Sequence, residues 1–149
     1  MIFAITIILS LLYAILLLSL LIGLLRTLNC QRFAKKADGI SVIVAFRNEV
    51  ENLPELIKSF NSQTLPFSQW EVIFIDDNSS DTSISAINSN SKNFNFRLIQ
   101  LSGVEGKKRA IIEGVKNASY NLIAITDADC TPSEFWLDSL VKSGDFALI

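Results

Sequence analysis

Acidic residues recur in this sequence directly after apolar runs. Asp76 and Asp77 follow WEVIFI, Asp127 and Asp129 follow LIAIT, and Glu49 lies just beyond ISVIVAF. The protein has no histidine, so carboxylates gathered at one place would need a cation as their partner. Carboxylate oxygens suit Mg²⁺ or Mn²⁺, and Mg²⁺ in proteins usually keeps substrate phosphates among its ligands. The pattern therefore indicates a site for a divalent cation and a phosphate-bearing ligand.

Each acidic segment also has a plainer explanation as a turn or helix cap, because Asp and Ser are favoured in both. We accept that explanation for Ser79, Ser80 and Asp81. It is less convincing for Asp76 and Asp77, since adjacent like charges directly after an apolar strand are costly without a ligand. Three acidic segments at three strand ends favour a shared site.

A basic segment, Lys107-Lys108-Arg109, opens an expected helix directly after Gly106. Cations at a helix N-terminus oppose the helix dipole, unless an anion is held there. A diphosphate contacted by Lys107 would explain the segment, and a solvated basic helix start is the alternative.

The apolar pattern predicts an α/β domain. Strands are expected over residues 40–46, 70–75, 96–101, 122–126 and 146–149, and helices over residues 52–63 and 107–118, after Asp81 or Thr82, and from residue 132. The helix over 107–118 is expected to bury Ala110, Ile111, Gly114 and Val115. Alternating strands and helices imply a mostly parallel sheet covered on both faces. Ligands then bind outside the carboxyl ends of the strands, where the acidic segments lie.

The N-terminal segment has a different character. Residues 2–25 carry no charge, and as a helix they would be about 36 Å long, enough to cross a hydrocarbon core of roughly 30 Å. A cleaved signal peptide is the alternative, but no basic segment precedes the run and no A-x-A site follows it. We expect a transmembrane helix over 1–25, a juxtamembrane linker over 26–39 and a domain over 40–149. Basic residues only follow the run, which places the domain in the cytoplasm.

Composition excludes several classes of function. The formal net charge of −2 gives no sign of the basic face that nucleic-acid binding favours. The two cysteines, Cys30 and Cys130, form neither a disulfide framework nor a zinc pattern, which agrees with a reducing cytoplasm. The absence of histidine removes histidine-based triads and most zinc sites.

Four motifs in order resemble family 2 glycosyltransferases of the Rossmann-like GT-A fold, over about residues 40–149. They are SVIVAFRNE at 41–49, VIFIDDNSSD at 72–81, Gly106-Lys107 followed by Ala110 and Gly114, and TDAD at 126–129. The resemblance implies a set of substrate-binding residues: Ala45, Arg47, Glu49, Asp76, Asp77, Lys107 and Asp127.

The same resemblance implies a role for each position. The backbone at Ala45 and the side chain of Glu49 would line the nucleoside pocket, and Asp77 would face a uracil ring. Asp127 would lie near the ribose. Asp129 would hold the Mg²⁺ or Mn²⁺ ion that bridges the diphosphate.

The implied reaction moves a sugar, of hexose or N-acetylhexosamine type, from a nucleotide-sugar donor to an acceptor hydroxyl with inversion. The acceptor would be a glycan or a lipid-linked molecule. Metal and Lys107 would stabilise charge on the leaving phosphate, and a carboxylate would take the acceptor's proton. That base belongs to a later acidic motif, which this sequence lacks. We therefore expect the 149 residues to be part of a longer enzyme, to bind donor weakly at best and to transfer no sugar.

Two other functions remain open from the sequence. LIAITDADCT at 122–131 also fits the first motif of haloacid-dehalogenase-type phosphatases, with Asp127 as nucleophile and Asp129 as acid. Little chain follows for the further residues that such enzymes need. The second alternative is a membrane-tethered α/β module that binds a nucleotide without turnover.

Overall fold

The structure, a computed structural model, describes residues 2–30, 38–90, 93–103 and 106–143. The strand expected over 146–149 lies outside these residues. The chain divides into two units, residues 1–35 and residues 36–149, which are described separately.

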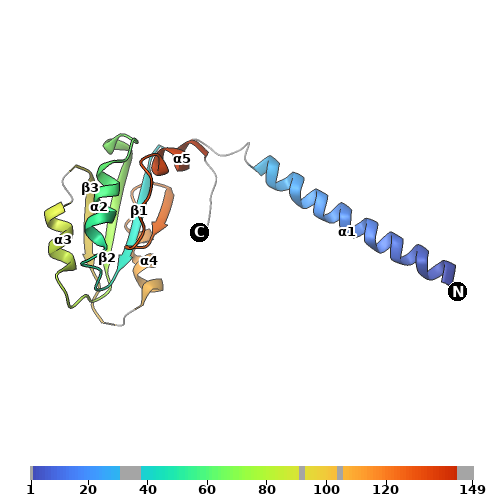
Figure 1. Ribbon diagram of the computed structural model, residues 1–149, viewed down its shortest axis with the longest axis horizontal. Coiled ribbons are helices and arrows are strands. Elements are labelled where there is room, and N and C mark those ends of the chain that lie inside the picture. Colours follow the sequence, from blue (N-terminus) through green and yellow to red (C-terminus); the bar gives the residue numbers. More distant parts are fainter. Residues whose placement is uncertain (1, 31–37, 91–92, 104–105, 144–149) are drawn as a thin grey trace. The chain divides into compact units, whose positions relative to one another are not determined.

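The first unit contains one long helix, α1 (Ile2–Cys30), which Figure 1 shows as an unbroken helix. Its segment Ile5–Leu25 has a mean hydropathy of 2.8 and is long and apolar enough to cross a membrane, criteria that a signal sequence also meets. The hydroxyls of Thr6 and Ser19 donate to carbonyls three residues earlier in the helix, which satisfies both groups without water. The helix continues beyond the apolar run, so residues 26–30, expected in the linker, are helical.

The second unit is built on a parallel sheet of four strands in the order β3-β2-β1-β4 (Figure 1). The strands are β1 (Ile40–Phe46), β2 (Trp70–Asp76), β3 (Asn95–Gln100) and β4 (Leu122–Thr126). The expected α/β fold with a parallel sheet is confirmed, and the strand ends differ from the expected ones by at most one residue. Because the strands are parallel, all their carboxyl ends lie at one edge of the sheet.

Helices cover both faces of the sheet. On one face, α2 (Leu53–Asn61), α3 (Ser83–Asn90) and α5 (Trp136–Ser143) contribute to one apolar core with alternate residues of the strands. On the other face, α4 (Lys107–Lys116) packs on Ile43, Ile73 and Ile75. A short 3₁₀ turn, η2 (Phe67–Gln69), leads into β2.

The helix α4 lies unusually close to the sheet at Gly114. A Cβ added there would lie 2.5 Å from Cγ2 of the buried Ile43, so the absence of a side chain sets the approach of helix to strand. Ala110 and Gly114, one turn apart, form the buried row. Val115 was expected on this face, which is wrong: it lies beside that row and is 44% exposed.

At the opposite edge of the sheet, the amino ends of the strands are tied together by Glu71, a charged residue inside an apolar strand. Its carboxylate accepts hydrogen bonds from the Ser41 hydroxyl at 2.8 Å, the Arg97 guanidinium at 2.8 Å and the Ser119 backbone N–H at 2.7 Å. Burial alone would raise the pKa of Glu71, but these hydrogen bonds outweigh it and hold the pKa below its usual value. The carboxylate is therefore ionised and joins β1, β2, β3 and the segment before β4.

This network predicts an acid-sensitive fold. A carboxyl with a lowered pKa stabilises the folded state above its unfolded pKa of about 4.3, and that contribution is lost as pH falls through the folded value. We expect Glu71→Gln to lower the free energy of unfolding at pH 7 by about 1–3 kcal/mol, because the charge-assisted hydrogen bonds to the Glu71 carboxylate are lost. Below about pH 4 the difference from wild type should shrink.

The measurement is urea unfolding, followed by circular dichroism, of the full chain in detergent at pH 7 and pH 3.5. Glu51→Gln removes the same charge from an exposed side chain and should have little effect at either pH. An equal loss for Glu71→Gln at both pH values would contradict the ionised network.

Candidate donor-binding site

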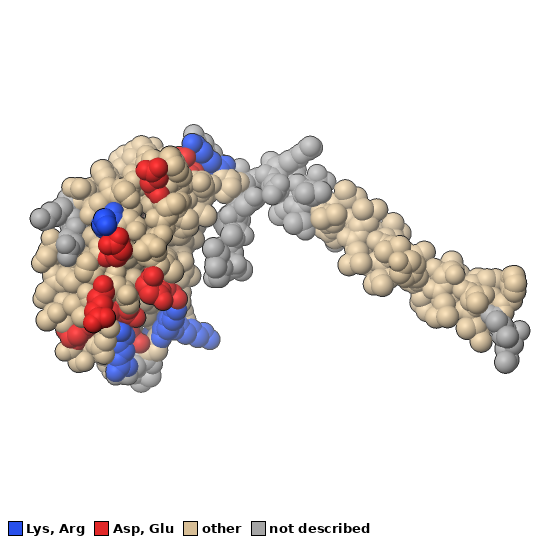
Figure 2. Space-filling model, in the orientation of Figure 1, with Lys and Arg blue, Asp and Glu red and all other residues tan. Residues whose placement is uncertain are grey.

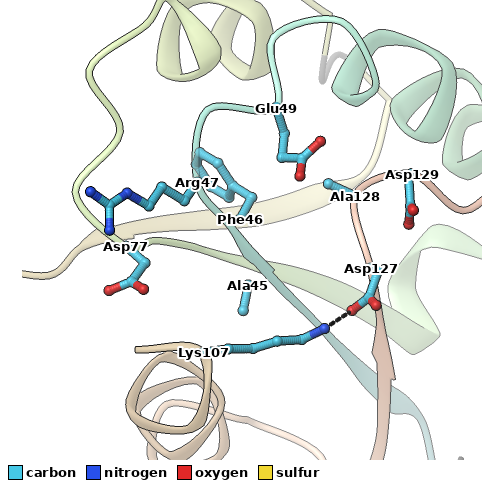
Figure 3. Close-up of a pocket in the computed structure, with 9 residues that line it drawn as sticks. All are labelled: Ala45, Phe46, Arg47, Glu49, Asp77, Lys107, Asp127, Ala128 and Asp129. Atoms are coloured by element: carbon cyan, nitrogen blue, oxygen red, sulfur yellow. Dashed lines mark ion pairs between the residues drawn. The ribbon is translucent and has the colours of Figure 1, made fainter. Parts of the chain in front are cut away.

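The carboxyl ends of β1, β2 and β4 border a single cavity of about 220 Å³. The strand register places Phe46 opposite Asp76 and Val44 opposite Thr126, so the three acidic segments emerge at one edge of the sheet. The cavity is lined by Ala45, Phe46, Arg47, Glu49, Asp77, Lys107, Asp127, Ala128 and Asp129 (Figure 3). In the space-filling view, acidic and basic side chains lie beside one another at the lower end of the domain (Figure 2).

The side chain of Asp77 closes one side of the cavity and caps α4. Both carboxylate oxygens accept from the Gly106 backbone N–H, at 2.9 and 3.1 Å. Gly106 has a φ of 146°, a conformation that residues with a side chain rarely adopt. A carboxylate is favoured at a helix N-terminus by the helix dipole. Asp77 is therefore an anion, supplied by the protein, at the basic N-terminus of α4.

Lys107, the first cation of that basic segment, is held across the cavity by the carboxylate of Asp127, the residue directly after β4. Lys107 Nζ lies 2.7 Å from Asp127 Oδ1, and the two side chains are 60% and 51% exposed (Figure 3). An ion pair this exposed contributes about 0–1 kcal/mol, so Lys107 can exchange Asp127 for another anion at little cost. The contact of Lys107 with a diphosphate stays a prediction.

Asp76 is the one expected substrate-binding residue that does not line the cavity. It is only 3% exposed, and its Oδ1 accepts from the Ser79 backbone N–H at 2.9 Å, which closes the turn after β2. Successive side chains of a strand point to opposite faces, so only one member of the Asp76-Asp77 pair can face the cavity. Each carboxylate has a backbone N–H partner, which explains how the adjacent charges are accommodated without a ligand.

The metal position expected at Asp129 rests on one carboxylate. Asp129 is exposed on the loop after β4 and lines the cavity, while Glu49 accepts from the Asn52 amide at 2.6 Å. Among the described residues, no group of three or more acidic or cysteine side chains is placed to hold a metal. The site therefore fits Mg²⁺ or Mn²⁺ only where a ligand's phosphates complete the coordination, which is a common arrangement for Mg²⁺.

Sequence reasoning missed several residues of this region. Phe46 and Ala128 line the cavity, and Asn48 adopts a left-handed backbone with a φ of 55° directly after β1. An asparagine at the end of a strand was the available signal for that turn, because asparagine tolerates this conformation better than most residues.

The fold and the cavity define a Rossmann-like domain of the GT-A type. The family model for glycosyl transferase family 2 matches residues 41–145. The chain therefore belongs to glycosyl transferase family 2.

One curated relative is poly-beta-1,6-N-acetyl-D-glucosamine synthase of Staphylococcus epidermidis, which is 35% identical over 104 residues. The match covers 70% of this chain and 25% of that protein, so the chain spans about a quarter of the relative's length.

Two solved structures share the fold. TarS 1-349 of S. aureus, in complex with UDP-GlcNAc, is 27% identical with a TM-score of 0.62, and the match covers 70% of this chain and 30% of the TarS 1-349 chain. The mannosyltransferase PcManGT of Pyrobaculum calidifontis, in complex with GDP-Man and Mn2+, is 25% identical with a TM-score of 0.63, and the match covers 68% and 30% of the two chains.

Proposed function

We propose that this chain is the donor-binding part of a membrane-anchored glycosyltransferase that moves a sugar from a nucleoside-diphosphate sugar to an acceptor hydroxyl. The observation that carries the proposal is the single cavity at the carboxyl edge of the sheet, where Glu49, Asp77 and Asp129 meet. Membership of family 2 and the nucleotide sugars bound by TarS and PcManGT support it. We propose a UDP-linked N-acetylhexosamine as the donor, because TarS binds UDP-GlcNAc and the curated relative is a poly-N-acetylglucosamine synthase.

Each wall of the cavity has a proposed part in donor binding. The Ala45 backbone and the Glu49 side chain hold the nucleoside, and Asp77 accepts from the N–H of a uracil ring. Asp127 accepts from a ribose hydroxyl once Lys107 leaves it. Arg47, exposed at the rim, is proposed to contact the substrate.

The proposed chemistry depends on where charge develops. When the bond between sugar and diphosphate breaks, negative charge grows on the leaving phosphate, and Lys107 stabilises it by moving from Asp127 to the phosphate. A bound Mg²⁺ or Mn²⁺ ion, with Asp129 as its protein ligand, would add Lewis-acid stabilisation of the same oxygens. Inversion requires attack from the opposite face of the sugar, by an acceptor hydroxyl of a glycan or a lipid-linked molecule that loses its proton to a carboxylate base.

The phosphatase alternative has no support. The family match over residues 41–145 points to sugar transfer instead.

The helix α1 is proposed as the membrane anchor. It is apolar enough to cross a bilayer, and basic residues follow it while none precedes it. By the positive-inside rule, we propose that the donor-binding domain lies on the cytoplasmic side of the membrane.

Isothermal titration of the full chain in detergent tests the proposal. We expect UDP and UDP-GlcNAc to bind in the presence of Mn²⁺ and to bind at least about tenfold more weakly after chelation, since the ion links Asp129 to the diphosphate. UMP, which lacks the second phosphate, is the matched control and should show little metal dependence. No binding of any nucleoside diphosphate would contradict the proposal.

We expect no UDP release from UDP-GlcNAc by these 149 residues in the presence of an oligosaccharide acceptor. Measured turnover would contradict this expectation and would place the base within the chain.

A further inference from the structure

Two loops beside the cavity are joined by a relay of hydrogen bonds that the proposed donor contacts do not use. The Glu49 backbone N–H donates to the Ser83 hydroxyl oxygen at 2.9 Å, and the Val50 backbone N–H donates to Asp81 Oδ2 at 3.2 Å. The Ser83 hydroxyl in turn donates to Asp81 Oδ1. The loop that carries Glu49 is therefore held by side chains from the loop between β2 and α3.

A second pair of contacts joins the same loops one residue earlier. The Asn48 backbone N–H donates to the Ser79 hydroxyl at 3.0 Å, and the Ser80 backbone N–H donates to Asn48 Oδ1 at 2.8 Å. The left-handed backbone of Asn48 turns both its backbone N–H and its side chain toward the neighbouring loop. The chain is thus fixed on both sides of the point where Glu49 enters the cavity.

Asp81 and Ser83 are the centre of this arrangement. Ser83 is fully buried, and its hydroxyl both accepts from Glu49 and donates to Asp81. The hydrogen bond from Ser83 lowers the pKa of Asp81, so at neutral pH both oxygens are acceptors. Neither residue lines the cavity, so an effect on a ligand would be indirect, through the loop that carries Glu49.

We propose that Asp81 and Ser83 form a clasp that positions Glu49 for donor binding. This inference rests on the proposed function for its consequence, but the clasp itself is a property of the free protein. Asp81→Asn leaves one acceptor oxygen and introduces an NH₂ group, which cannot accept from Val50 or Ser83. Either the Val50 N–H or the Ser83 hydroxyl then loses its acceptor, and the loop that carries Glu49 is no longer held in place.

Amide hydrogen exchange of the full chain in detergent tests the clasp without a ligand. In Asp81→Asn, the Glu49 and Val50 amides should exchange on the order of tenfold faster, as expected for loss of a charge-assisted hydrogen bond. Asp38→Asn makes the same chemical change at an exposed residue before β1, and should leave both amides unchanged. Wild-type exchange at both amides in Asp81→Asn would overturn the clasp.

A double-mutant cycle with Glu49→Ala tests the effect on the donor, with UDP and Mn²⁺ as the titrant. Asp81→Asn should weaken UDP binding about tenfold in the wild-type background and not further in the Glu49→Ala background, because residues that act as a unit are not additive. The same fold-loss in both backgrounds would overturn positioning through Glu49. If the wild-type chain binds no UDP, the proposed function fails, while the exchange experiment still decides whether the clasp exists.

Discussion

Asp129→Ala is expected to abolish the Mn²⁺-dependent part of UDP binding and to leave the weaker, metal-independent part. Asp129 is the proposed protein ligand, and no described cluster of acidic side chains could replace it. Without its carboxylate the ion would be held by the diphosphate alone. We expect the affinity measured with Mn²⁺ to fall by about 100-fold, or about 2.7 kcal/mol.

The matched control for this prediction is Glu134→Ala, which removes one carboxylate from an exposed side chain outside the cavity. Its backbone carbonyl, which accepts from Thr64, is unaffected by the change. UDP titration with and without Mn²⁺ should show wild-type metal dependence in this control. If Asp129→Ala keeps that dependence as well, the metal assignment is wrong.

Asp77→Ala is expected to weaken UDP binding by about 10- to 100-fold both with and without Mn²⁺. Two effects combine. The variant loses the acceptor proposed for the uracil ring, and it loses the anion that caps the Gly106 N–H at the start of α4. A lost N-cap costs about 0.5–2 kcal/mol of stability, so the thermal midpoint should fall as well. The unchanged metal dependence distinguishes this variant from Asp129→Ala.

Asp77→Asn separates the two roles of this carboxylate. It keeps one acceptor oxygen for the Gly106 N–H, so most of the stability should return. Its amide has only one acceptor oxygen to share between the Gly106 N–H and the uracil ring, so UDP binding should stay weak. If Asp77→Ala loses stability but binds UDP as wild type does, Asp77 is a helix cap and not a base-recognition residue.

Much of the fold could be predicted because its signals are local. The run ISVIVAF is long, β-branched and uninterrupted, and the strand β1 (Ile40–Phe46) has these bounds. Alternation of such runs with amphipathic segments implied parallel strands, and parallel strands bring their carboxyl ends to one edge. The convergence of Glu49, Asp77 and Asp129 at one cavity follows from that rule.

The remaining features depend on neighbours that are distant in sequence. Ser79, Ser80 and Asp81 already satisfied the expectations for a turn, so nothing in their types indicated that they bond the loop after β1. The pairing of Lys107 with Asp127 required the spacing between α4 and β4, which no local pattern contains. Glu71 was the exception, because a lone charge inside the apolar run WEVIFI was a readable signal of a buried, partnered carboxylate.

Paramagnetic broadening would show whether a diphosphate and a divalent ion bind together at the carboxyl edge of the sheet. Amide spectra of the full chain in detergent would be recorded with trace Mn²⁺ before and after addition of UDP. We predict that UDP concentrates the broadening on residues around Asp129 and Lys107, and that residues around Glu71 at the opposite edge are spared. Broadening that ignores UDP, or that is strongest near Glu71, would contradict it.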